Sequence, residues 1–204
     1  QRFFTERNYD YTFLLDKAHN LVSRSRDMYT KEISSQQIKD LLDKLQTLPH
    51  PPQKIVDKLN TLLNDFDLIK EPLVNYQQAD VIIEEKLASL TKKLMYFCDF
   101  TTDCLAENPH FSLKDDLLEF FFAAYAFVKI SDYYNNSFRT HLFITENSEL
   151  LIRVFCLDSS ELIANSLNLG GSTVLFSATL SPLNYYQEMF GLIDNSLLYQ
   201  LSSP

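Results

Sequence analysis

The sequence predicts a mixed α/β fold, mostly helical, in which part of a parallel sheet carries a large all-helical insertion. Apolar runs rich in aromatic or branched residues lie near both ends of the chain, at 11–15 and 173–176, and such runs are typical of buried strands in a parallel sheet. Between them, apolar residues recur at helical spacing. A chain of 204 residues with 46% hydrophobic content is long enough to bury the core of one or two domains.

The first elements are a strand and two helices. The run YTFLL at 11–15 is the strand, and a short helix is expected to follow through about Tyr29. Ser34 and Gln37 form a capping-box pattern that begins a second helix, which stops before Pro49. One face of this helix is apolar and carries Ile38, Leu41, Leu42 and Leu45.

Three further helices are predicted in the middle of the chain. Residues 53–69 repeat the helical periodicity until Pro72, a long helical stretch spans about 76–107, and a capping pattern at Ser112 begins a helix over 113–134. Four helices with short connections bury their apolar stripes most simply by packing as a bundle.

Strand signals return in the last third. The segments 141–145 and 150–157 flank a short polar loop and predict a β-hairpin. A helix closed by the glycines at 170–171 leads to the second strand at 173–176, and a last helix is expected over about 182–190.

The matching strand-like runs predict a discontinuous domain. We assign residues 1–30 and 137–204 to this domain and residues 31–136 to a helical insertion within it. The returning part, 137–204, then includes the predicted hairpin as well as the second parallel strand.

Charge, cysteine spacing and hydropathy argue against several classes of protein. A net charge of −9 argues against a free-standing nucleic-acid binder, so any DNA contact should be local or assisted by other parts. The three cysteines lack the spacing of a zinc site or disulfide framework, which favours reduced thiols in a cytoplasmic protein. The most apolar segment, 117–128, is too short to cross a membrane, and the opening residues carry no secretory signal and suggest a piece of a longer protein.

The first candidate site is the tetrapeptide DKAH at 16–19, which differs in one letter from the magnesium-binding box DEAH of nucleic-acid motors. Asp16 ends a predicted parallel strand, where ligands gather in open α/β sheets. Lys17 stands where a working enzyme has the glutamate that deprotonates water, and a lysine ammonium cannot accept that proton at neutral pH. Taken alone, Asp16 fits a strand-end or helix-capping aspartate about equally well.

The second candidate site, SATLSP, follows the second strand. The hydroxyls of Ser177 and Thr179 are available to hydrogen-bond His19 or a ligand. The alternative is a hydroxyl-rich turn that caps the next helix.

Together, LLDKAHNLVSRSRDMY and GGSTVLFSATLSPLNYYQEMFG resemble motifs II and III of the DinG and XPD group of superfamily 2 DNA helicases. The resemblance implies a partial P-loop, RecA-like motor sheet with a helical Arch domain inserted between the motifs. It places Asp16 at the water-mediated magnesium position, Lys17 at the catalytic glutamate and His19 at the motif II histidine. Residues 177–179, Ser-Ala-Thr, correspond to coupling motif III.

The departures from that family are as informative. The chain has three glycines and no GxxxxGK phosphate loop. It also lacks a second motor domain and the four-cysteine iron–sulfur insertion of some relatives. The resemblance therefore implies a parent helicase of the kind used in DNA repair, which would use ATP and Mg²⁺ to translocate on single-stranded DNA and unwind duplexes. This chain, which would need the rest of that helicase as its partner, is expected to be inactive and to hold no cofactor.

Several alternatives remain open at this level. Lys17 is a deliberate inactivating substitution, a natural loss in a degenerate paralogue, or a change without functional meaning. Arg24 and Arg26 are the better candidates for contacts to the DNA backbone, whereas the aromatic residues over 120–134 fit helix packing better than base stacking. Two rival functions are an acidic helical interaction module and a helicase fused to an exonuclease.

Overall fold

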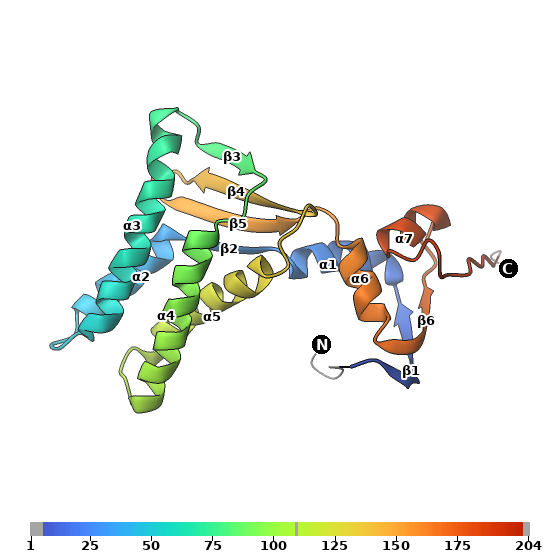
Figure 1. Ribbon diagram of the computed structural model, residues 1–204, viewed down its shortest axis with the longest axis horizontal. Helices are drawn as coiled ribbons and strands as arrows, with labels where there is room; N and C mark the ends of the chain where they lie inside the picture. The colour runs from blue at the N-terminus through green and yellow to red at the C-terminus, as the bar shows by residue number, and fades with distance from the viewer. Residues whose placement is uncertain (1–5, 109, 202–204) are drawn as a thin grey trace. The chain divides into compact units, whose positions relative to one another are not determined.

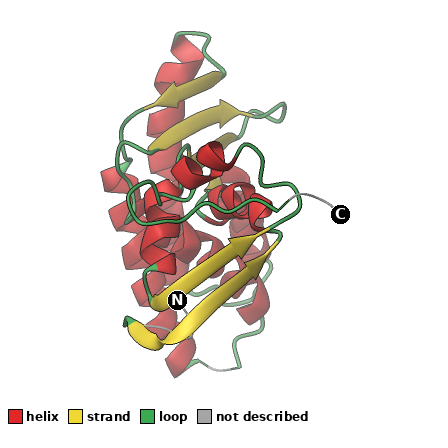
Figure 2. Cartoon of the chain, turned by 90° about the vertical axis from the view of Figure 1, so that its right-hand side faces the viewer, coloured by secondary structure: helices red, strands yellow, loops and turns green. Residues whose placement is uncertain are grey.

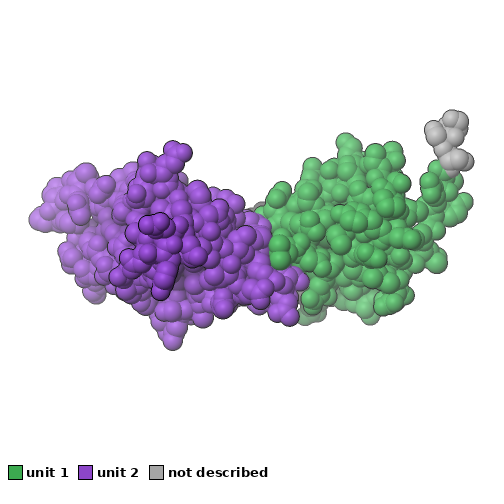
Figure 3. All heavy atoms as spheres, turned by 90° about the horizontal axis from the view of Figure 1, so that it is seen from above, with its two compact units in different colours: residues 1–29, 156–204 green, residues 30–155 purple. Residues whose placement is uncertain are grey.

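The computed structural model describes residues 6–108 and 110–201. The fold is mixed α/β (Figure 1). Of the described residues, 51% are helical, and the strands form two small sheets. The chain divides into two compact units: residues 1–29 with 156–204 form unit 1, and residues 30–155 form unit 2 (Figure 3). Within the described residues, every helix is too short or too polar to cross a membrane.

Unit 1 is built on a pair of parallel strands, β1 (Asn8–Asp16) and β6 (Gly170–Phe176) (Figure 2). Their register runs from Thr12 opposite Ser172 to Asp16 opposite Phe176, with an irregularity between Asn8 and Thr12. The two strand-like runs predicted near the chain ends are therefore confirmed as strands, and they lie side by side.

The helices of unit 1 cover one face of this sheet. They are α1 (Leu21–Met28), α6 (Ser160–Leu167) and α7 (Leu183–Met189), and a 3₁₀ turn, η1 (Ala18–Asn20), precedes α1. Their shared core consists of buried apolar residues against which Leu15 and Leu175 of the strands pack: Ala18, Val22, Ile163, Leu167 and Phe190. The core of unit 1 therefore packs against one face of the β1–β6 pair.

The other face of the β1–β6 sheet is open in unit 1. Leu14, Val174 and Phe176 project from it, and Leu14 is 69% exposed. The expectation that both strands are buried is wrong for this chain, because a two-stranded sheet covered on one side leaves alternate side chains uncovered.

The two glycines at 170–171 open β6, whereas the sequence predicts that they close the preceding helix. Helix α6 ends at Leu167 with Asn168 as its cap. A Cβ on Gly171 would overlap the Tyr9 carbonyl oxygen, and a Cβ on Gly170 would lie 2.8 Å from the Phe13 ring. Glycine is needed here because the backbone of β1 passes so close to β6.

Unit 2 contains a four-stranded sheet in the order β2-β5-β4-β3. The strands are β2 (Lys31–Ser34), β3 (Asp80–Ile83), β4 (Phe138–Ile144) and β5 (Leu150–Cys156). The β2–β5 and β3–β4 pairs are antiparallel. The predicted hairpin is confirmed as β4 and β5.

This sheet corrects two predictions. The segment 31–136 is not all-helical, since it contributes β2 and β3. Residues 137–155, which the sequence pattern assigns to the returning segment, belong to unit 2 because β5 pairs with β2 and β4 pairs with β3. The strand β3 lies inside a stretch predicted to be helical, where Val81, Ile82 and Ile83 favour a strand once a partner is present.

Four helices accompany the sheet, as predicted: α2 (Ser35–Gln46), α3 (Gln53–Asn75), α4 (Ala88–Glu107) and α5 (Lys114–Ser131). The largest side chains that they bury completely include Phe66, Leu94, Phe97, Leu117 and Phe127. Aromatic packing joins α4 to α5, where Phe97 and Phe120 meet edge to face with ring centroids 5.2 Å apart. Unit 2 therefore has a continuous helical core.

The predicted helix ends agree with the structure at Ser34 but differ at Ser112 and Pro72. The capping box at Ser34 is confirmed, with the Gln37 N–H donating to Ser34 Oγ at 3.3 Å and the Ser34 N–H donating to Gln37 Oε1 at 2.9 Å. The cap of α5 is Leu113 and not Ser112. Helix α3 continues past Pro72 to Asn75, and the Pro72 carbonyl accepts a hydrogen bond from the Tyr76 N–H.

The cysteines in the described chain are free thiols, as predicted. Burial raises the pKa of Cys98 to about 12 and that of Cys156 to about 11. Both therefore stay protonated at neutral pH and behave as small core residues.

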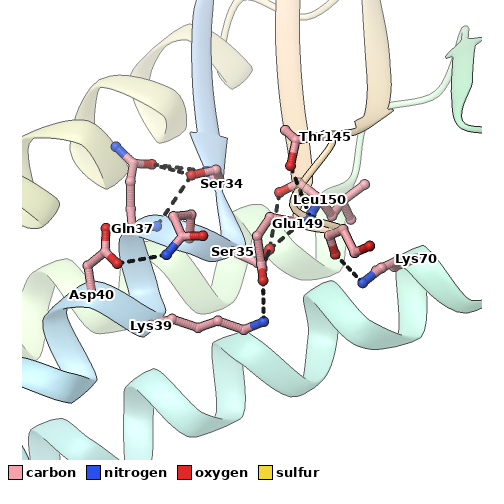
Figure 4. Close-up of polar contacts among 11 residues, drawn as sticks. Ser34, Ser35, Gln37, Lys39, Asp40, Lys70, Thr145, Glu149 and Leu150 are labelled. Atoms are coloured by element: carbon pink, nitrogen blue, oxygen red, sulfur yellow. Dashed lines mark hydrogen bonds and ion pairs between the residues drawn. The ribbon is translucent and has the colours of Figure 1, made fainter.

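A buried carboxylate ties the β4–β5 connection to the helices of unit 2 (Figure 4). Glu149 Oε2 accepts a hydrogen bond from Ser35 Oγ at 2.6 Å, and Glu149 Oε1 accepts one from Lys39 Nζ at 2.6 Å. Ser35 Oγ also receives the Leu150 N–H at 2.9 Å, and Lys70 donates to the Ser148 carbonyl. This cluster holds α2 and α3 to the end of the hairpin.

The pKa of Glu149 makes the stability of unit 2 depend on pH. Burial alone would raise this pKa, but hydrogen bonds from Lys39 and Ser35 and the charges of Lys39 and Lys70 outweigh it and lower the pKa below its ordinary value. A carboxylate with a depressed folded-state pKa stabilises the fold above its unfolded-state pKa, and this contribution is lost as pH falls through the folded-state value.

We expect Glu149→Gln to reduce the free energy of unfolding by about 1–3 kcal/mol at pH 7, because the charge-assisted bonds to Lys39 and Ser35 are weakened. The difference from the unmodified chain should shrink as pH falls from 5 to 3. Urea unfolding followed by circular dichroism measures both effects. A difference that stays constant over this pH range would contradict the assignment to Glu149.

Candidate functional site

The candidate site lies where β1 and β6 end. Asp16, the last residue of β1, is paired in register with Phe176, the last residue of β6. The segments that follow the two strands, 17–20 and 177–180, therefore start side by side at the carboxyl edge of a parallel sheet. Ligands of open α/β sheets bind at this edge.

His19 connects the two segments. Its Nδ1 lies 2.7 Å from Ser177 Oγ and 3.0 Å from Thr179 Oγ1, and the two hydroxyl oxygens are 3.2 Å apart. The Thr179 N–H also donates to Ser177 Oγ at 3.2 Å. The predicted contact of these hydroxyls with His19 is therefore confirmed across 158 residues of sequence, while Ala178 lies exposed between them.

The hydrogen-bonding of the cluster depends on the state of the imidazole. With Nδ1 unprotonated, either hydroxyl donates to it, and with Nδ1 protonated the ring donates to a hydroxyl oxygen. Two hydroxyls share this one ring nitrogen, so the tautomer of His19 sets the donor and the acceptor in both contacts. The arrangement can link the strand end of β1 to the turn that leads into α7.

Asp16 and Lys17 are both exposed at the same edge. Asp16 Oδ1 accepts the N–H of Lys17 at 2.7 Å, and Lys17 adopts a left-handed backbone conformation with φ 53° and ψ 41°. This turn carries the chain from β1 into the η1 turn, where the Asn20 N–H donates to the Lys17 carbonyl at 3.0 Å. Asp16 thus shapes the local turn as a strand-end aspartate does, and its second carboxylate oxygen has no role in that bond.

The residues at this edge do not form a complete site for magnesium and a nucleotide. Over residues 6–108 and 110–201, no group of three or more His, Cys, Asp or Glu side chains could hold a metal ion. Asp16 supplies one carboxylate. The neighbouring Lys17 ammonium is positively charged and would repel a magnesium ion. The sequence also contains no phosphate-binding glycine loop.

The two arginines that the sequence predicts as candidates for DNA contact differ in their surroundings. Arg24 is exposed on α1. Arg26 is partly buried, and its Nη2 lies 3.7 Å from the Met189 sulfur of α7, so this side chain packs α1 against α7. The His19 contacts described above involve neither arginine.

A hydroxyl pair on the open face of the same sheet is not among the predicted site residues. Thr12 Oγ1 and Ser172 Oγ lie 2.7 Å apart on opposite strands. The register of β1 and β6 pairs Thr12 with Ser172. Knowing this register would have been enough to predict the contact, because residues opposite one another on neighbouring strands share a face. Together with Asp16 they make the open face partly polar.

We expect Ser177→Ala combined with Thr179→Val to reduce the free energy of unfolding of unit 1 by about 1 kcal/mol, since two partners of a partly buried imidazole are removed. Hydrogen exchange of the amides in η1 and α1 should speed up while exchange in α4 and α5 is unchanged. Ser181→Ala is the matched control, an exposed serine just beyond the cluster. Equal exchange in the control and the double variant would show that the contacts add no stability.

Comparison with known proteins adds no family to this description: no protein-family model matches the chain, and no curated protein matches it. The inferences about function therefore rest on the geometry at the ends of β1 and β6 and on the resemblance of their flanking motifs.

Proposed function

We propose that this chain is the segment from motif II to motif III of an ATP-dependent DNA helicase of the DinG and XPD group. The observation that carries the proposal is the parallel pairing of β1 with β6, which brings His19 within hydrogen-bonding distance of Ser177 and Thr179. Chance matches to DxAH and SAT, 158 residues apart, would not be expected to pair in register.

In the proposed role, each group performs a separate task at this edge. Asp16 would hold a magnesium-bound water, and the hydroxyls of Ser177 and Thr179 would pass changes at the nucleotide to the rest of the motor through His19. Lys17 would leave the attacking water without a base, so this form would bind better than it hydrolyses. ATP and Mg²⁺ would supply the energy of translocation in a protein that also carries the phosphate loop.

Unit 2 is proposed to be the Arch-like insertion of that helicase, next to the path of single-stranded DNA. Support comes from the chain order: unit 2 spans residues 30–155, and unit 1 is assembled from the segments on either side of it. The open face of the β1–β6 sheet also fits a motor domain in which further strands and helices complete the fold.

The deciding experiment uses a protein in which this chain is joined to a phosphate-binding loop and a second motor domain. ATP hydrolysis is measured with Lys17 as found and with Lys17→Glu, each with and without single-stranded DNA. Hydrolysis by the glutamate form alone, stimulated by DNA, supports the motor function. If neither form hydrolyses ATP, the motor proposal fails. Asp16→Asn in the glutamate background is the matched control and should abolish hydrolysis.

The second candidate function is an acidic protein-interaction module on a degenerate helicase scaffold. The observation that favours it is a set of exposed apolar side chains on α4 and α5, among them Met95 and Phe122. Its test is whether this surface binds protein and whether Phe122→Ala abolishes that binding.

A further inference from the structure

Helices α4 and α5 expose apolar side chains on the face that they turn away from the core of unit 2. The two helices pack side by side, are joined by a short connection and run antiparallel (Figure 1). On α5, Phe122 is 60% exposed and Tyr125 is 45% exposed, and on α4 Met95 and Tyr96 are also exposed. We call these four residues the apolar patch.

Only part of the aromatic run of α5 serves the helix packing that the sequence predicts. Phe120 and Phe127 are buried as expected, whereas Phe122 and Tyr125 are exposed. The exposed rings are nevertheless held in place. Phe121 stacks on Tyr125 with an interplanar angle of 11° and meets Phe122 edge to face with ring centroids 5.3 Å apart. Rings that are already ordered lose little side-chain freedom when a second surface packs on them.

On α4, charges of opposite sign flank the patch. Lys92 lies three residues before Met95, and Asp99 lies three residues after Tyr96. We call Lys92 and Asp99 the α4 pair. Both are exposed, and neither takes part in an ion pair within the described chain. The Lys92 ammonium lies over the Tyr96 ring, 5.7 Å from its centre, so the α4 pair is free to meet charges of another molecule.

On α5, the charges follow the opposite order along the chain. Glu119 lies three residues before Phe122, and Lys129 lies four residues after Tyr125. We call Glu119 and Lys129 the α5 pair. Both are exposed, and the ion pairs of the described residues include neither of them. Because the helices run antiparallel, the two lysines lie at one end of the patch and the two carboxylates at the other.

The two charge pairs are centred at a similar height along the helices. Contacts between the helices fix this height: the Cys98 thiol contacts the Phe121 carbonyl, and the Phe97 ring meets the Phe120 ring with centroids 5.2 Å apart. Measured from these contacts, the midpoints of the α4 pair and the α5 pair fall within about one helical turn of each other. A single two-fold axis can therefore serve both helices.

Charge selects one of the two ways in which a second copy can lie on this face. A two-fold axis parallel to the helices would place the lysine end on the lysine end of the second copy. A two-fold axis across the helices would instead place each helix antiparallel on the same helix of the second copy. Lys92 would then meet Asp99 of the second copy, and Glu119 would meet Lys129 of the second copy, so that only this arrangement joins opposite charges.

Further carboxylates surround the two charge pairs. They are Glu84, Glu85 and Asp132 beyond the lysines and Asp103, Glu107, Asp115 and Asp116 beyond the carboxylates. Arg139 pairs with Glu84 at 3.1 Å, and Lys44 pairs with Asp116 at 2.6 Å and lies near Glu119. In the selected arrangement the outer carboxylates of the two copies approach one another at the rim, where water and salt screen them. The contact should therefore be reversible, with its register set by the inner pairs.

We propose that the apolar patch is a contact between two copies of this chain, related by a two-fold axis that crosses α4 and α5 at the level of the patch. Phe122 and Tyr125 would pack against Ala123 and Ala126 of the second copy, which are half-buried and leave room for rings. Aromatic residues and methionine at the centre with charges at the rim is the usual composition of a protein interface. The contact belongs to unit 2 and does not depend on the proposed motor function.

Sedimentation velocity of the 204-residue chain at micromolar concentrations and physiological salt tests the proposal. We expect a reversible equilibrium between monomer and dimer. Phe122→Ala should raise the dimer dissociation constant about tenfold or more, because a two-fold contact loses the ring on both sides. Tyr76→Ala is the matched control, since it removes a ring that is 77% exposed at the end of α3, and it should leave the dissociation constant unchanged.

Exchanging charges tests the arrangement of the two copies. Lys129→Glu and Glu119→Lys should each raise the dissociation constant about tenfold or more, because each brings like charges together at two places. An equimolar mixture of the two variants should dimerise again, since every contact of the mixed dimer then joins opposite charges. Lys54→Glu and Glu71→Lys change exposed residues of α3 and should dimerise alone and in mixture as the unmodified chain does.

The proposal is overturned if the chain stays monomeric over this concentration range, or if the mixture of the two charge variants does not dimerise. A dimer that Phe122→Ala leaves unchanged also overturns it, because the copies would then meet elsewhere, as on the open face of the β1–β6 sheet. So does binding of fluorescein-labelled dT20 by the monomer that Phe122→Ala removes, since the face would then bind nucleic acid. The motor proposal is decided separately by its own ATP hydrolysis assay.

Discussion

Replacing Phe127 with alanine is expected to lower the free energy of unfolding of unit 2 by about 3–5 kcal/mol. Phe127 lies on the buried face of α5 and is 0% exposed. The change therefore removes an entire buried ring and leaves a cavity that the packed helices fill only in part. A loss of this size is a large part of the roughly 5–15 kcal/mol by which a domain is stable. Urea unfolding followed by far-ultraviolet circular dichroism measures it.

Phe122→Ala is the matched control for this substitution. It removes the same side chain from the same helix at a position that is 60% exposed, and we expect a change within about 0.5 kcal/mol. If the two variants unfold at the same urea concentration, the assignment of the two faces of α5 is wrong. The comparison also shows whether Phe122 can be removed without harm to the fold.

The second large effect is expected at Gly171. Gly171→Ala should destabilise the β1–β6 pair by about 3 kcal/mol, because the new Cβ would overlap the Tyr9 carbonyl oxygen of the neighbouring strand. Backbone offers no rotamer that could move away, so the strands must separate locally. Hydrogen exchange of peptides from β1 and β6 should become much faster.

Ser172→Ala is the control for Gly171→Ala, since it changes the next residue of β6 and removes only an exposed hydroxyl contact with Thr12. It should change stability by less than about 1 kcal/mol. Similar exchange rates in the two variants would mean that the strands are not as close as described. Loss of the β1–β6 pair should also release the contacts of His19 with Ser177 and Thr179.

Local patterns in the sequence predicted the features that depend on near neighbours. The capping box at Ser34, the four helices of unit 2 and the hairpin follow from spacing within a few residues. The His19 cluster was predicted from two motifs, because parallel strands bring their carboxyl ends together.

Features that depend on distant partners were missed. The four residues of β3 form a strand because β4, about 60 residues later, pairs with them, and their own pattern is too short to indicate it. The bond from Ser35 to Glu149 spans 114 residues. The exposure of Phe122 depends on which face of α5 its neighbours cover, which helical periodicity in an almost wholly apolar segment does not reveal.

The register of β2 and β5 has a consequence for the order of folding. Lys31 is paired with Val154, so folded unit 2 holds its own entry and exit points on adjacent strands. Before unit 2 folds, β1 can reach β6 only by closing the loop formed by residues 30–155, at an entropic cost of roughly 4 kcal/mol. After unit 2 folds, its two ends are already held together by β2 and β5, so most of the loop-closure entropy has already been lost. Unit 2 should therefore fold first. Once folded, it shortens the loop that has to close before β1 can pair with β6.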